Sequence, residues 1–179
     1  MQAITKAELL ALLSAARAHK ERDFLMILVA YCHGLRASEV VSILQDNIQD
    51  AHLVVARGKH SNPCNQALVS HVNPLLDERT ALLGFAGKSK PGELLFPVTR
   101  RQFLRIVRRH AEAAGLPPHK RNCHMLKHTM GSEIYEKTKD LELVQLRLGH
   151  KEESSSLIYA KRATEIKADV ETERVLNSD

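Results

Sequence analysis

The chain has 179 residues, of which 44% are hydrophobic and 26% are charged, a balance typical of one soluble globular domain. Its net charge of +5 fits a polyanionic partner but is weak evidence for one by itself. The longest apolar run, Phe24 to Cys32, is too short to cross a membrane, and the three cysteines form no CxxC pair. The composition therefore argues against a membrane protein, a disulfide scaffold and a zinc ribbon, and it predicts a protein of a reducing cytoplasm.

Two helices are predicted at the start of the chain. Residues 6–18 carry leucines and alanines at helical spacing, and Thr5 with Glu8 forms a capping box, which indicates a helix start and not a signal peptide. Residues 21–33 form a second, more apolar helix. Gly34 is expected to end it, because glycine readily adopts the left-handed conformation that follows many helices.

A short helix and a small sheet are expected next. Ser38 can cap the helix "EVVSIL". The segment "HLVVARGKHSNPCNQALVS" then has two β-branched runs on either side of a turn-rich, basic stretch. This pattern predicts a β-hairpin or a three-stranded antiparallel sheet.

The rest of the chain is predicted to be helical. Asn73 is expected to cap a helix that runs to about residue 86, with Pro74 in its first turn, and Gly115 is expected to end a strong helix over residues 99–115. Further helices are expected from Asn122, from Asp140 to Leu148 before Gly149, from Ser154, and from about Thr164 to the end. The predicted fold class is therefore mainly α with a small antiparallel β-sheet, in one domain that spans residues 1–179.

Four arginines in the helix at residues 99–115 share one face, at spacings i, i+4, i+7 and i+8: Arg101, Arg105, Arg108 and Arg109. The simpler interpretation is a solvated charged face. Like charges at these spacings repel one another, however, and a phosphate backbone would relieve that repulsion while releasing counterions. We therefore predict that this face contacts nucleic acid.

A second cationic group lies in the segment that starts at Asn122. His124, Lys127 and His128 fall at i, i+3 and i+4, on one face of the first two helical turns. Unpaired amides and the helix dipole add to such side chains, so the pattern predicts an anion site. An ordinary surface helix is one alternative. An HxxxH metal pair is another, which is disfavoured because no glutamate follows the first histidine as in HExxH.

Three other residues mean little when each is taken alone. Arg36 follows a glycine in a loop between two helices, where its side chain can project over the surface. Lys59 lies in the hairpin turn, and exposed hairpin lysines are usually solvated. Tyr159 is one of only three tyrosines, and a lone tyrosine is structural far more often than catalytic.

Taken together and in order, these elements resemble the tyrosine recombinase (phage integrase) family. The resemblance rests on "HGLRASEV", "ARGKH", "HMLKHT", "LRLGH" and a tyrosine nine residues after the last histidine, His150. It covers Thr5 to about Ala163, and the order and spacing are more specific than any single motif. The compact size, with no evident N-terminal core-binding or arm-binding domain, resembles a small fimbrial-switch type of recombinase or an isolated catalytic domain.

The resemblance implies a chemistry for each matching residue. Tyr159 would attack a DNA phosphodiester and form a 3′-phosphotyrosine and a free 5′-hydroxyl, which conserves the bond energy so that no metal or other cofactor is needed. Arg36 would bind two phosphate oxygens with its planar guanidinium, braced by Glu39. Lys59 would act as general acid to the leaving 5′-oxygen. His124 and His150 would orient the phosphate and assist proton transfer.

One position departs from the family pattern. Lys127 stands where the HxxR element of the family has arginine, with His128 beside it as a supporting residue. The positive charge is kept, but the bidentate guanidinium fork is lost. Losing one good oxyanion donor costs roughly 2.7–4 kcal/mol in another enzyme class. We therefore expect an active enzyme whose rate Lys127 can lower.

The resemblance also implies partners. We expect double-stranded DNA with a specific recombination site, contacted by the four arginines and by Arg57 and His60 of the hairpin. Residues 164–179 are expected to form a helix that packs on a neighbouring protomer and links a DNA-dependent homo-tetramer. Host DNA-bending factors are further expected partners. The expected location is the cytoplasm, at the nucleoid if the source is bacterial.

Three other functions remain open. The chain can be a DNA-binding regulator of recombination whose site Lys127 disables, a relaxing type IB topoisomerase with the same chemistry, or a metal hydrolase built on the histidines. A covalent protein–DNA adduct separates an enzyme from a regulator, and insensitivity to a chelator removes the hydrolase. The DNA target and the outcome of the reaction, whether integration, excision or inversion, cannot be read from the chain.

Overall fold

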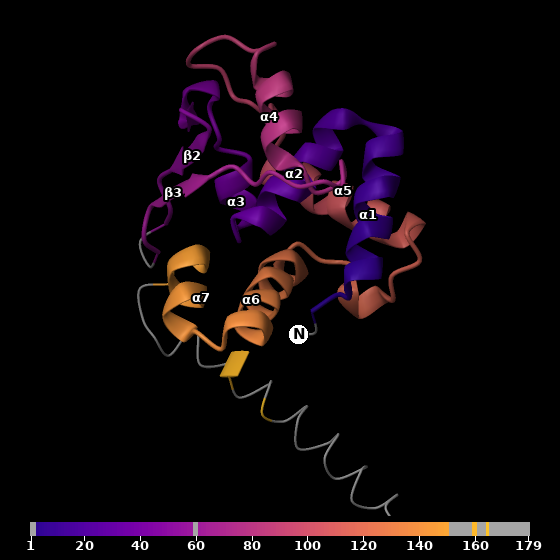
Figure 1. Cartoon of the computed structure of the whole chain (residues 1–179). Helices are drawn as coiled ribbons and strands as arrows, with labels where there is room; N and C mark the ends of the chain where they lie inside the picture. The colour runs from indigo at the N-terminus through magenta and orange to yellow at the C-terminus, as the bar shows by residue number, and fades with distance from the viewer. Residues whose placement is uncertain (1–2, 59–60, 151–158, 161–163, 165–179) are drawn as a thin grey trace, which may run out of the picture.

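The computed structural model describes residues 3–58, 61–150, 159–160 and 164, and Figure 1 shows how they are arranged. The described residues are mainly helical, with one small three-stranded antiparallel sheet at the left-hand side of Figure 1, which confirms the predicted fold class. None of the helices in the described part of the chain combines the length and the apolar character needed to span a membrane.

The helices are, in chain order, α1 (Lys6–His19), α2 (Glu21–Cys32), α3 (Ala37–Val40), α4 (Glu78–Ala86), α5 (Arg100–Ala113), α6 (His124–Thr138) and α7 (Leu141–Leu148). Short 3-10 turns occur at η1 (Gln45–Asn47) and η2 (Pro118–Lys120). The strands β1 (Ile48–Gln49), β2 (His52–Val55) and β3 (Cys64–Ala67) lie between α3 and α4.

Helix α2 is the centre of the core. Every residue from Asp23 to Cys32 is buried, and α2 packs against α1, α4, α5 and α6 (Figure 1). A helix that is covered on all sides is expected to be apolar all round, as this segment is. Gly34 follows α2 with a φ of +59°, so it adopts the left-handed conformation that was predicted to end the helix.

The sheet has the order β1-β2-β3 and is antiparallel throughout. The pairing of Val55 with Cys64 leaves residues 56–63 as the connection between β2 and β3, which we call the hairpin arm. Leu53, Val55 and Cys64 are buried in the core, and this burial fixes the register. The predicted three-stranded arrangement is confirmed. Lys59 and His60 of the hairpin arm lie outside the described residues.

Two predicted caps are wrong in position. Helix α3 starts at Ala37 and not after Ser38, because the Glu39 carboxylate accepts the Arg36 backbone N–H at 2.7 Å and makes Arg36 the residue before the helix. Helix α4 starts at Glu78, and Asp77 caps it in place of Asn73. Asn73 instead accepts the Leu75 N–H within a turn.

The late start of α4 follows from a buried ion pair. Glu78 Oε1 lies 2.8 Å from His33 Nε2, and both side chains are inaccessible to solvent. The other oxygen, Glu78 Oε2, accepts the Val69 N–H at 3.0 Å. Because unpaired buried charges are costly, these contacts hold Glu78 at one place beside α2 and thereby set the first residue of α4.

Helix α6 starts at His124 with Cys123 before it, and not at the predicted Asn122, although the Asn122 side chain does accept the Met125 N–H at 3.2 Å. The ends of α1 and α7 agree with their sequence signals. The Thr5 and Glu8 capping box is present at the start of α1. Asp140 caps α7 by accepting the Leu143 N–H at 3.0 Å, and Gly149 ends that helix in the left-handed conformation. Tyr159, Ala160 and Thr164 are helical, whereas the predicted cap at Ser154 and nearly all of the predicted C-terminal helix lie outside the described residues.

All three cysteines are free and buried: Cys32, Cys64 and Cys123. Burial raises the pKa of the Cys123 thiol to about 12 and that of the Cys32 thiol well above its ordinary value. These thiols therefore pack as small apolar side chains in the folded protein.

Candidate active site

Arg36 is held at the start of α3 by two side chains. Its Nη1 donates to Glu39 Oε1 at 3.1 Å and to Ser61 Oγ at 2.5 Å. Glu39 is buried, whereas 40% of the Arg36 side chain is exposed. The bracing contact expected from Glu39 is therefore present, and the remaining guanidinium N–H groups of Arg36 can face a ligand. Ser61 was missed in the sequence, because nothing local links a loop serine to an arginine 25 residues away.

Lys127 lies in the first turns of α6, facing Arg36. Together with His124 it lines one narrow cleft with Leu35, Arg36 and Cys123. Lys127 Nζ donates to the Leu148 carbonyl at 2.8 Å. Burial, together with the positive charges of Arg36 and Arg57, lowers the pKa of the Lys127 ammonium to about 8. At neutral pH this lysine is still charged but gives up its proton far more readily than an exposed lysine does.

His150 completes this group from the end of α7. It follows the left-handed Gly149, which turns the chain back toward the hairpin arm. Burial first, and then the charges of Lys127, Arg36 and Arg57, lower the pKa of His150 to about 4. The imidazole is therefore neutral near pH 7 in the free protein.

The hairpin arm is fastened to the turn that carries His150. Ser61 and His150 form an antiparallel bridge, and the Asn62 N–H donates to the Gly149 carbonyl at 3.0 Å. The Asn62 side-chain amide reaches the His150 carbonyl at 3.4 Å. Because Ser61 also binds Arg36, the arm connects two predicted site residues that lie far apart in the sequence. Lys59, two residues before Ser61, itself lies outside the described part of the chain.

Arg57 lies at the other end of the hairpin arm. Its Nη2 donates to the carbonyls of His33, at 2.6 Å, and Arg147, at 3.4 Å. Its guanidinium covers Gly149 so closely that a Cβ at that position would collide with it. The predicted DNA contact of Arg57 stays a prediction. The structure places its charge beside Lys127 and His150, a position that no local sequence signal indicates.

Tyr159 packs in a separate apolar cluster beside this group. It is 4% exposed and lies with Val144 and Leu148 of α7. Gly131 of α6 makes room for the ring, because a Cβ there would clash with it. Burial raises the pKa of the Tyr159 phenol to about 12. Burial therefore favours the protonated phenol in this arrangement.

The histidines of α6 lie where their spacing predicts. His124 is exposed at the mouth of the cleft, and the His128 ring lies 6.1 Å from the Tyr159 ring, centroid to centroid. His128 also contributes to the lowered pKa of His150. The helical face formed by His124, Lys127 and His128 therefore borders both the cationic group and the tyrosine.

The arginine face of α5 is exposed, as predicted, at Arg101, Arg105 and Arg108. Arg109 is different, because its Nη2 donates to the buried Asp23 of α2 at 2.7 Å. An acid therefore does neutralise part of this face, but it comes from another helix. The predicted DNA contacts of the four arginines stay predictions, as does that of His60, which is outside the described residues.

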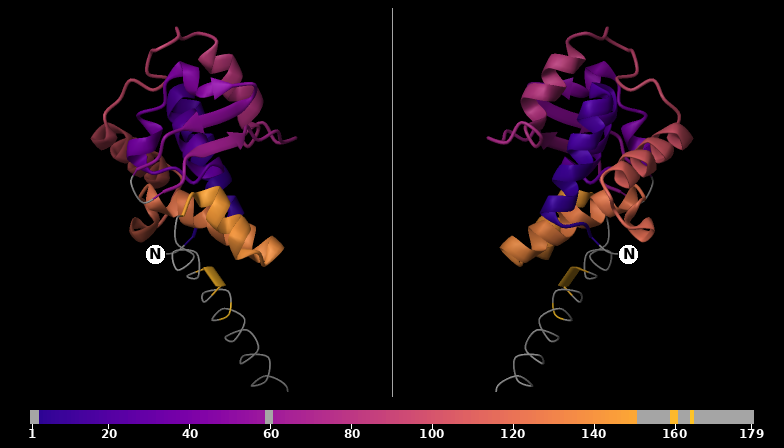
Figure 2. Two further views of the ribbon diagram at one scale, coloured as in Figure 1. Left: turned by 90° about the vertical axis from the view of Figure 1, so that its left-hand side faces the viewer. Right: turned by 90° about the vertical axis from the view of Figure 1, so that its right-hand side faces the viewer.

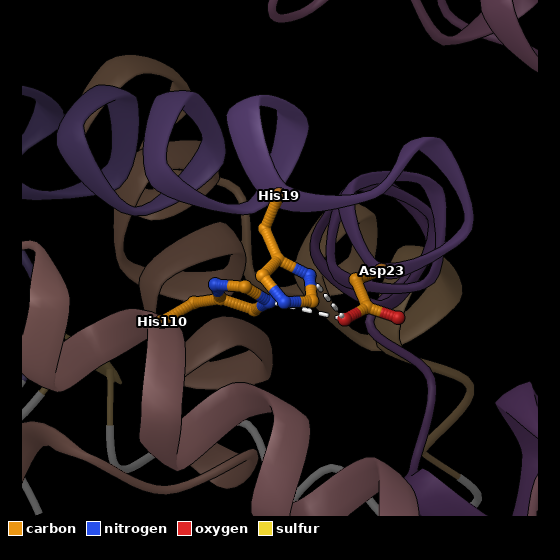
Figure 3. Close-up of side chains that lie close together, drawn as sticks. All are labelled: His19, Asp23 and His110. Atoms are coloured by element: carbon orange, nitrogen blue, oxygen red, sulfur yellow. Dashed lines mark hydrogen bonds and ion pairs between the residues drawn. The ribbon is translucent and has the colours of Figure 1, made fainter.

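Asp23 belongs to the one group of three candidate metal ligands in the described part of the chain, with His19 and His110 (Figure 3). His110 Nε2 lies 3.1 Å and His19 Nδ1 3.7 Å from Asp23 Oδ2. The Arg109 guanidinium lies 2.7 Å from the same oxygen and 3.3 Å from His110 Nε2, so a cation already occupies the place between the ligands. We interpret this group as an ion-pair network that joins α1, α2 and α5.

The cluster formed by Arg36, Arg57, Lys127 and His150, which we call the catalytic cluster after the role proposed for it below, has the charge that an anion site requires. Three cationic side chains converge, and within the described residues Glu39 is the carboxylate that braces them. Gathering like charges in a partly buried place is unfavourable, and a bound anion with several oxygens would offset that cost. Tyr159 supplies a hydroxyl from the neighbouring helical segment.

The sequence matches known proteins over most of its length. A model described as the phage integrase family matches residues 2–165. The chain is 29% identical over 177 residues to tyrosine recombinase XerD of Vibrio cholerae, covering 90% of this chain and 57% of the relative. It is 30% identical over 176 residues to tyrosine recombinase XerA of Thermococcus kodakarensis, covering 92% and 59%.

Solved structures show the same fold. A crystal structure of XerA recombinase superposes with a TM-score of 0.71 at 18% identity, covering 89% of this chain and 58% of that one. A lambda integrase tetramer bound to a Holliday junction gives a TM-score of 0.71 at 22% identity, covering 88% and 47%. The chain thus spans a little more than half the length of the two recombinases matched by sequence, and about half that of these two solved structures.

Proposed function

The chain belongs to the phage integrase family, and we propose that it is a site-specific recombinase that cuts and rejoins DNA through Tyr159. The observation that carries the proposal is the catalytic cluster, where Arg36, Lys127 and His150 come from three separate parts of the chain and lie beside Tyr159 and His128. A scissile phosphate is the ligand that best fits this charge.

The proposed reaction is a transesterification. The Tyr159 hydroxyl oxygen attacks phosphorus, a Tyr–O–P bond forms, and the bond from phosphorus to the 5′-oxygen breaks, which leaves a free 5′-hydroxyl. Arg36 and Lys127 offset the charge that develops on the non-bridging oxygens. The phenolic proton goes to a neighbouring base, His150 or His124, and a proton from Lys59 reaches the leaving oxygen. Attack by the 5′-hydroxyl of another strand reverses these steps and rejoins the DNA.

We propose two roles for Lys127. A lysine cannot make the bidentate contact of an arginine, but its pKa of about 8 lets it donate a proton near neutral pH, which arginine cannot do. We therefore assign Lys127 to charge stabilisation, with proton donation as a second capacity. At subsaturating DNA, where the rate reports the free protein, cleavage by the native protein should then fall as pH rises past about 8, while that of Lys127→Arg should not.

Tyr159 has to change its surroundings before it can react. Its phenol is buried, with a raised pKa, in the cluster around Leu148. We propose that bound DNA draws the tyrosine out of this cluster toward the phosphate, so that the free protein holds its nucleophile in an unreactive place. The regulator hypothesis rests on the same observation, because a protein that never released Tyr159 would bind DNA without cutting it.

Partners follow from the same proposal. The relatives with solved structures include XerH bound to its difH substrate and lambda integrase as a tetramer on a Holliday junction. For this chain we propose a double-stranded recombination site and assembly into a tetramer on DNA, with host DNA-bending factors as further partners. The C-terminal segment that was predicted to link the protomers lies outside the described residues.

A trapped covalent adduct tests the proposal. Because the DNA target is unknown, the substrate is a pool of duplexes with a randomised core and one bridging 5′-phosphorothiolate, whose cleavage releases a thiol that cannot rejoin. The protein is incubated with the pool and EDTA, denatured, and the DNA attached to it is sequenced. We expect an EDTA-resistant adduct with a recurring sequence, absent with Tyr159→Phe and retained with Tyr135→Phe as matched control.

The outcomes separate the two functions. An adduct that depends on Tyr159 establishes strand cleavage. An adduct that forms only with Lys127→Arg means that the site is intact but disabled by its lysine, and the regulator then becomes the better description. Binding to DNA without any adduct from either protein would contradict the enzyme proposal.

A further inference from the structure

The end of α7, which leads into His150, is held by groups from other elements. The last four carbonyls of an α-helix have no partner within the helix. In α7 these carbonyls belong to four residues: Gln145, Leu146, Arg147 and Leu148. The first two accept N–H groups of the turn that follows, from His150 at 3.0 Å and from Gly149 at 3.3 Å. The last two accept side-chain donors from elsewhere in the fold.

Two side chains bond these last two carbonyls. Gln66 of β3 donates from Nε2 to the Arg147 carbonyl at 2.8 Å. Lys127 of α6 donates from Nζ to the Leu148 carbonyl, also at 2.8 Å. Arg57 reaches the Arg147 carbonyl as well, but at 3.4 Å. Helix α7 packs mainly against α6 and lies below the strands in Figure 1 and in the left-hand view of Figure 2. Gln66 therefore joins the end of α7 to the sheet.

The direction of the Gln66 amide is set by His33. The Gln66 Oε1 lies 2.9 Å from His33 Nδ1, and His33 forms the buried ion pair with Glu78. Burial would lower the pKa of His33, but the charge of Glu78 raises it to about 9, so the ring carries a hydrogen on each nitrogen. Nδ1 therefore donates to the amide oxygen. The amide N–H groups have to point the other way, toward the Arg147 carbonyl.

Gln66 and Lys127 differ in what an occupied site does to them. A phosphate in the catalytic cluster competes with the Leu148 carbonyl for the Lys127 ammonium, because hydrogen bonds between charged groups are the stronger ones. Gln66 is neutral, half-buried and bonded to His33, so a phosphate does not draw it away. Its bond to the Arg147 carbonyl, three residues before His150, then holds the end of α7.

We propose, on the basis of the proposed function, that Gln66 is a positioning residue for DNA cleavage. It holds the last turn of α7 so that His150 keeps its place beside the scissile phosphate. It acts through the Arg147 carbonyl and touches neither the phosphate nor the nucleophile. Misplacement of a reacting group by about 1 Å can cost about 10²-fold in rate. The effect therefore falls on the rate constant of the bound complex and not on the affinity for DNA.

The first measurement uses the free protein. Gln66→Met keeps the length of the side chain and removes the amide. Gln49→Met is the matched control, because the exposed Gln49 of β1 also donates from Nε2 to a backbone carbonyl, that of Asp46, at 2.9 Å. Hydrogen exchange is followed by NMR at the Asn62 and His150 amides, which close the turn after α7. We expect exchange about tenfold faster at both amides in Gln66→Met and native rates in the control. Native rates in both variants would overturn the inference.

The second measurement is single-turnover cleavage, with protein in excess, of the phosphorothiolate duplex that carries the site found with the randomised pool. We expect Gln66→Met to lower the rate constant at saturating protein about tenfold, with the half-saturating concentration within about twofold of the native value. Gln49→Met should match the native protein in both. A variant that was only partly folded would have less active protein and an unchanged rate constant at saturation, so the result separates positioning from stability.

Gln66→Glu separates the two bonds of Gln66. Its carboxylate still accepts the His33 N–H but has no hydrogen to donate to the Arg147 carbonyl. We expect this variant to fold, as judged by circular dichroism, and to lose the same factor in the saturating rate constant. It keeps the test decisive if Gln66→Met does not fold. Cleavage at the native rate by Gln66→Glu would contradict the positioning role.

A double variant shows through which residue Gln66 acts. If it positions His150, then adding Gln66→Met to His150→Gln should slow cleavage by less than about twofold further, because effects on one shared function are not additive. A further loss of the full tenfold would mean that Gln66 does not act through His150, and the inference would be wrong.

The failures are distinguishable. If the native protein forms no covalent adduct with any duplex of the pool, the proposed function is wrong, and the exchange rates still decide whether Gln66 holds the end of α7. If the native protein forms the adduct but Gln66→Met cleaves at the native saturating rate, the positioning role is overturned and the proposed function stands.

Discussion

Two groups of charged side chains in this molecule differ in how well their positive charges are matched by carboxylates. Around Asp23, one fully buried carboxylate is met by Arg22, Arg109 and His110. In the catalytic cluster, Arg36, Arg57 and Lys127 converge with Glu39 as bracing acid. The first group joins α1, α2 and α5, and the second lies where α3, α6, α7 and the hairpin arm meet.

The pKa shifts show the difference. Burial would raise the pKa of Asp23, yet hydrogen bonds from Arg22 and His110 hold it below its ordinary value, so the charged form is favoured. In the catalytic cluster burial and neighbouring charges both lower the pKa of Lys127 and His150, so the charged forms are disfavoured. Around Asp23 opposite charges are matched, and the group stabilises the fold. In the catalytic cluster positive charges outnumber negative ones, so the repulsion between them lowers the stability, and a bound anion can offset that loss.

The largest expected effect is the loss of stability that follows when the group around Asp23 loses its carboxylate. Asp23→Ala removes a fully buried carboxylate together with the hydrogen bonds that Arg22, Arg109 and the buried His110 make to it, and should lower the free energy of unfolding by about 3–5 kcal/mol. Urea unfolding followed by circular dichroism measures it. Glu112→Ala is the control, because its exposed carboxylate pairs with Arg121 at 2.8 Å and should cost less than about 1 kcal/mol. A loss from Asp23→Ala no larger than that of the control would contradict the structural role.

The matching change in the catalytic cluster should act in the opposite direction. Lys127→Met removes one of the converging charges at similar volume, so the free energy of unfolding should stay unchanged or rise by about 1 kcal/mol. Cleavage should fall by about 10²–10³-fold. Urea unfolding and adduct formation measure the two effects. Lys137→Met, in the last turn of α6, is the control. If Lys127→Met lowered the free energy of unfolding as much as Asp23→Ala does, the proposed difference between the two charged groups would be contradicted.

A smaller effect is expected at the turn that carries His150. Gly149→Ala places a side chain at a φ of +66° and against the Arg57 guanidinium. We expect a loss of about 1–3 kcal/mol in the free energy of unfolding. Gly115→Ala, with a φ of +74° and open space around the new Cβ, gives the conformational part alone. Combining Gly149→Ala with Arg57→Ala should recover the difference, and no recovery would show that Arg57 does not cover this glycine.

The smallest effect is a pH dependence. The folded pKa of His150, about 4, lies below the ordinary 6.5. Between these values the unfolded chain binds a proton that the folded chain does not, so this histidine makes stability fall as pH falls from 6.5 toward 4. His150→Gln should flatten the curve in this window relative to that of the native protein. Thermal melts across the pH range measure it, and parallel curves would contradict the assignment.

Local signals predicted much of this fold. The capping box at Thr5 and Glu8, the apolar run of α2 with Gly34 behind it, and Asp140 with Gly149 around α7 each depend on residues within a turn or two of one another. The start of α4 could not be read in this way. Asn73 and Asp77 are both good caps, and a buried contact of Glu78 with His33, 45 residues away in sequence, decides between them.

In the candidate site, too, local motifs indicated some residues, whereas tertiary contacts determine the others. Arg36, Lys127, His128 and His150 follow from motif order, and the structure places them near one another. Ser61 on Arg36, the burial of Arg57 and the buried position of Tyr159 are tertiary contacts. No spacing rule reports them, because each joins segments that the fold alone brings together.

The three buried cysteines can report when the core around them becomes accessible to solvent, because each can then be alkylated. Alkylating reagents react with cysteine through its nucleophilic thiolate, and burial both blocks access to these thiols and suppresses ionisation at Cys32 and Cys123. The three positions sample different parts of the core: Cys32 at the end of α2, Cys64 in β3 and Cys123 just before α6. The rate at which each one is alkylated, read by mass spectrometry with and without DNA, would therefore show which part of the molecule opens when DNA is added, with no label or substitution introduced.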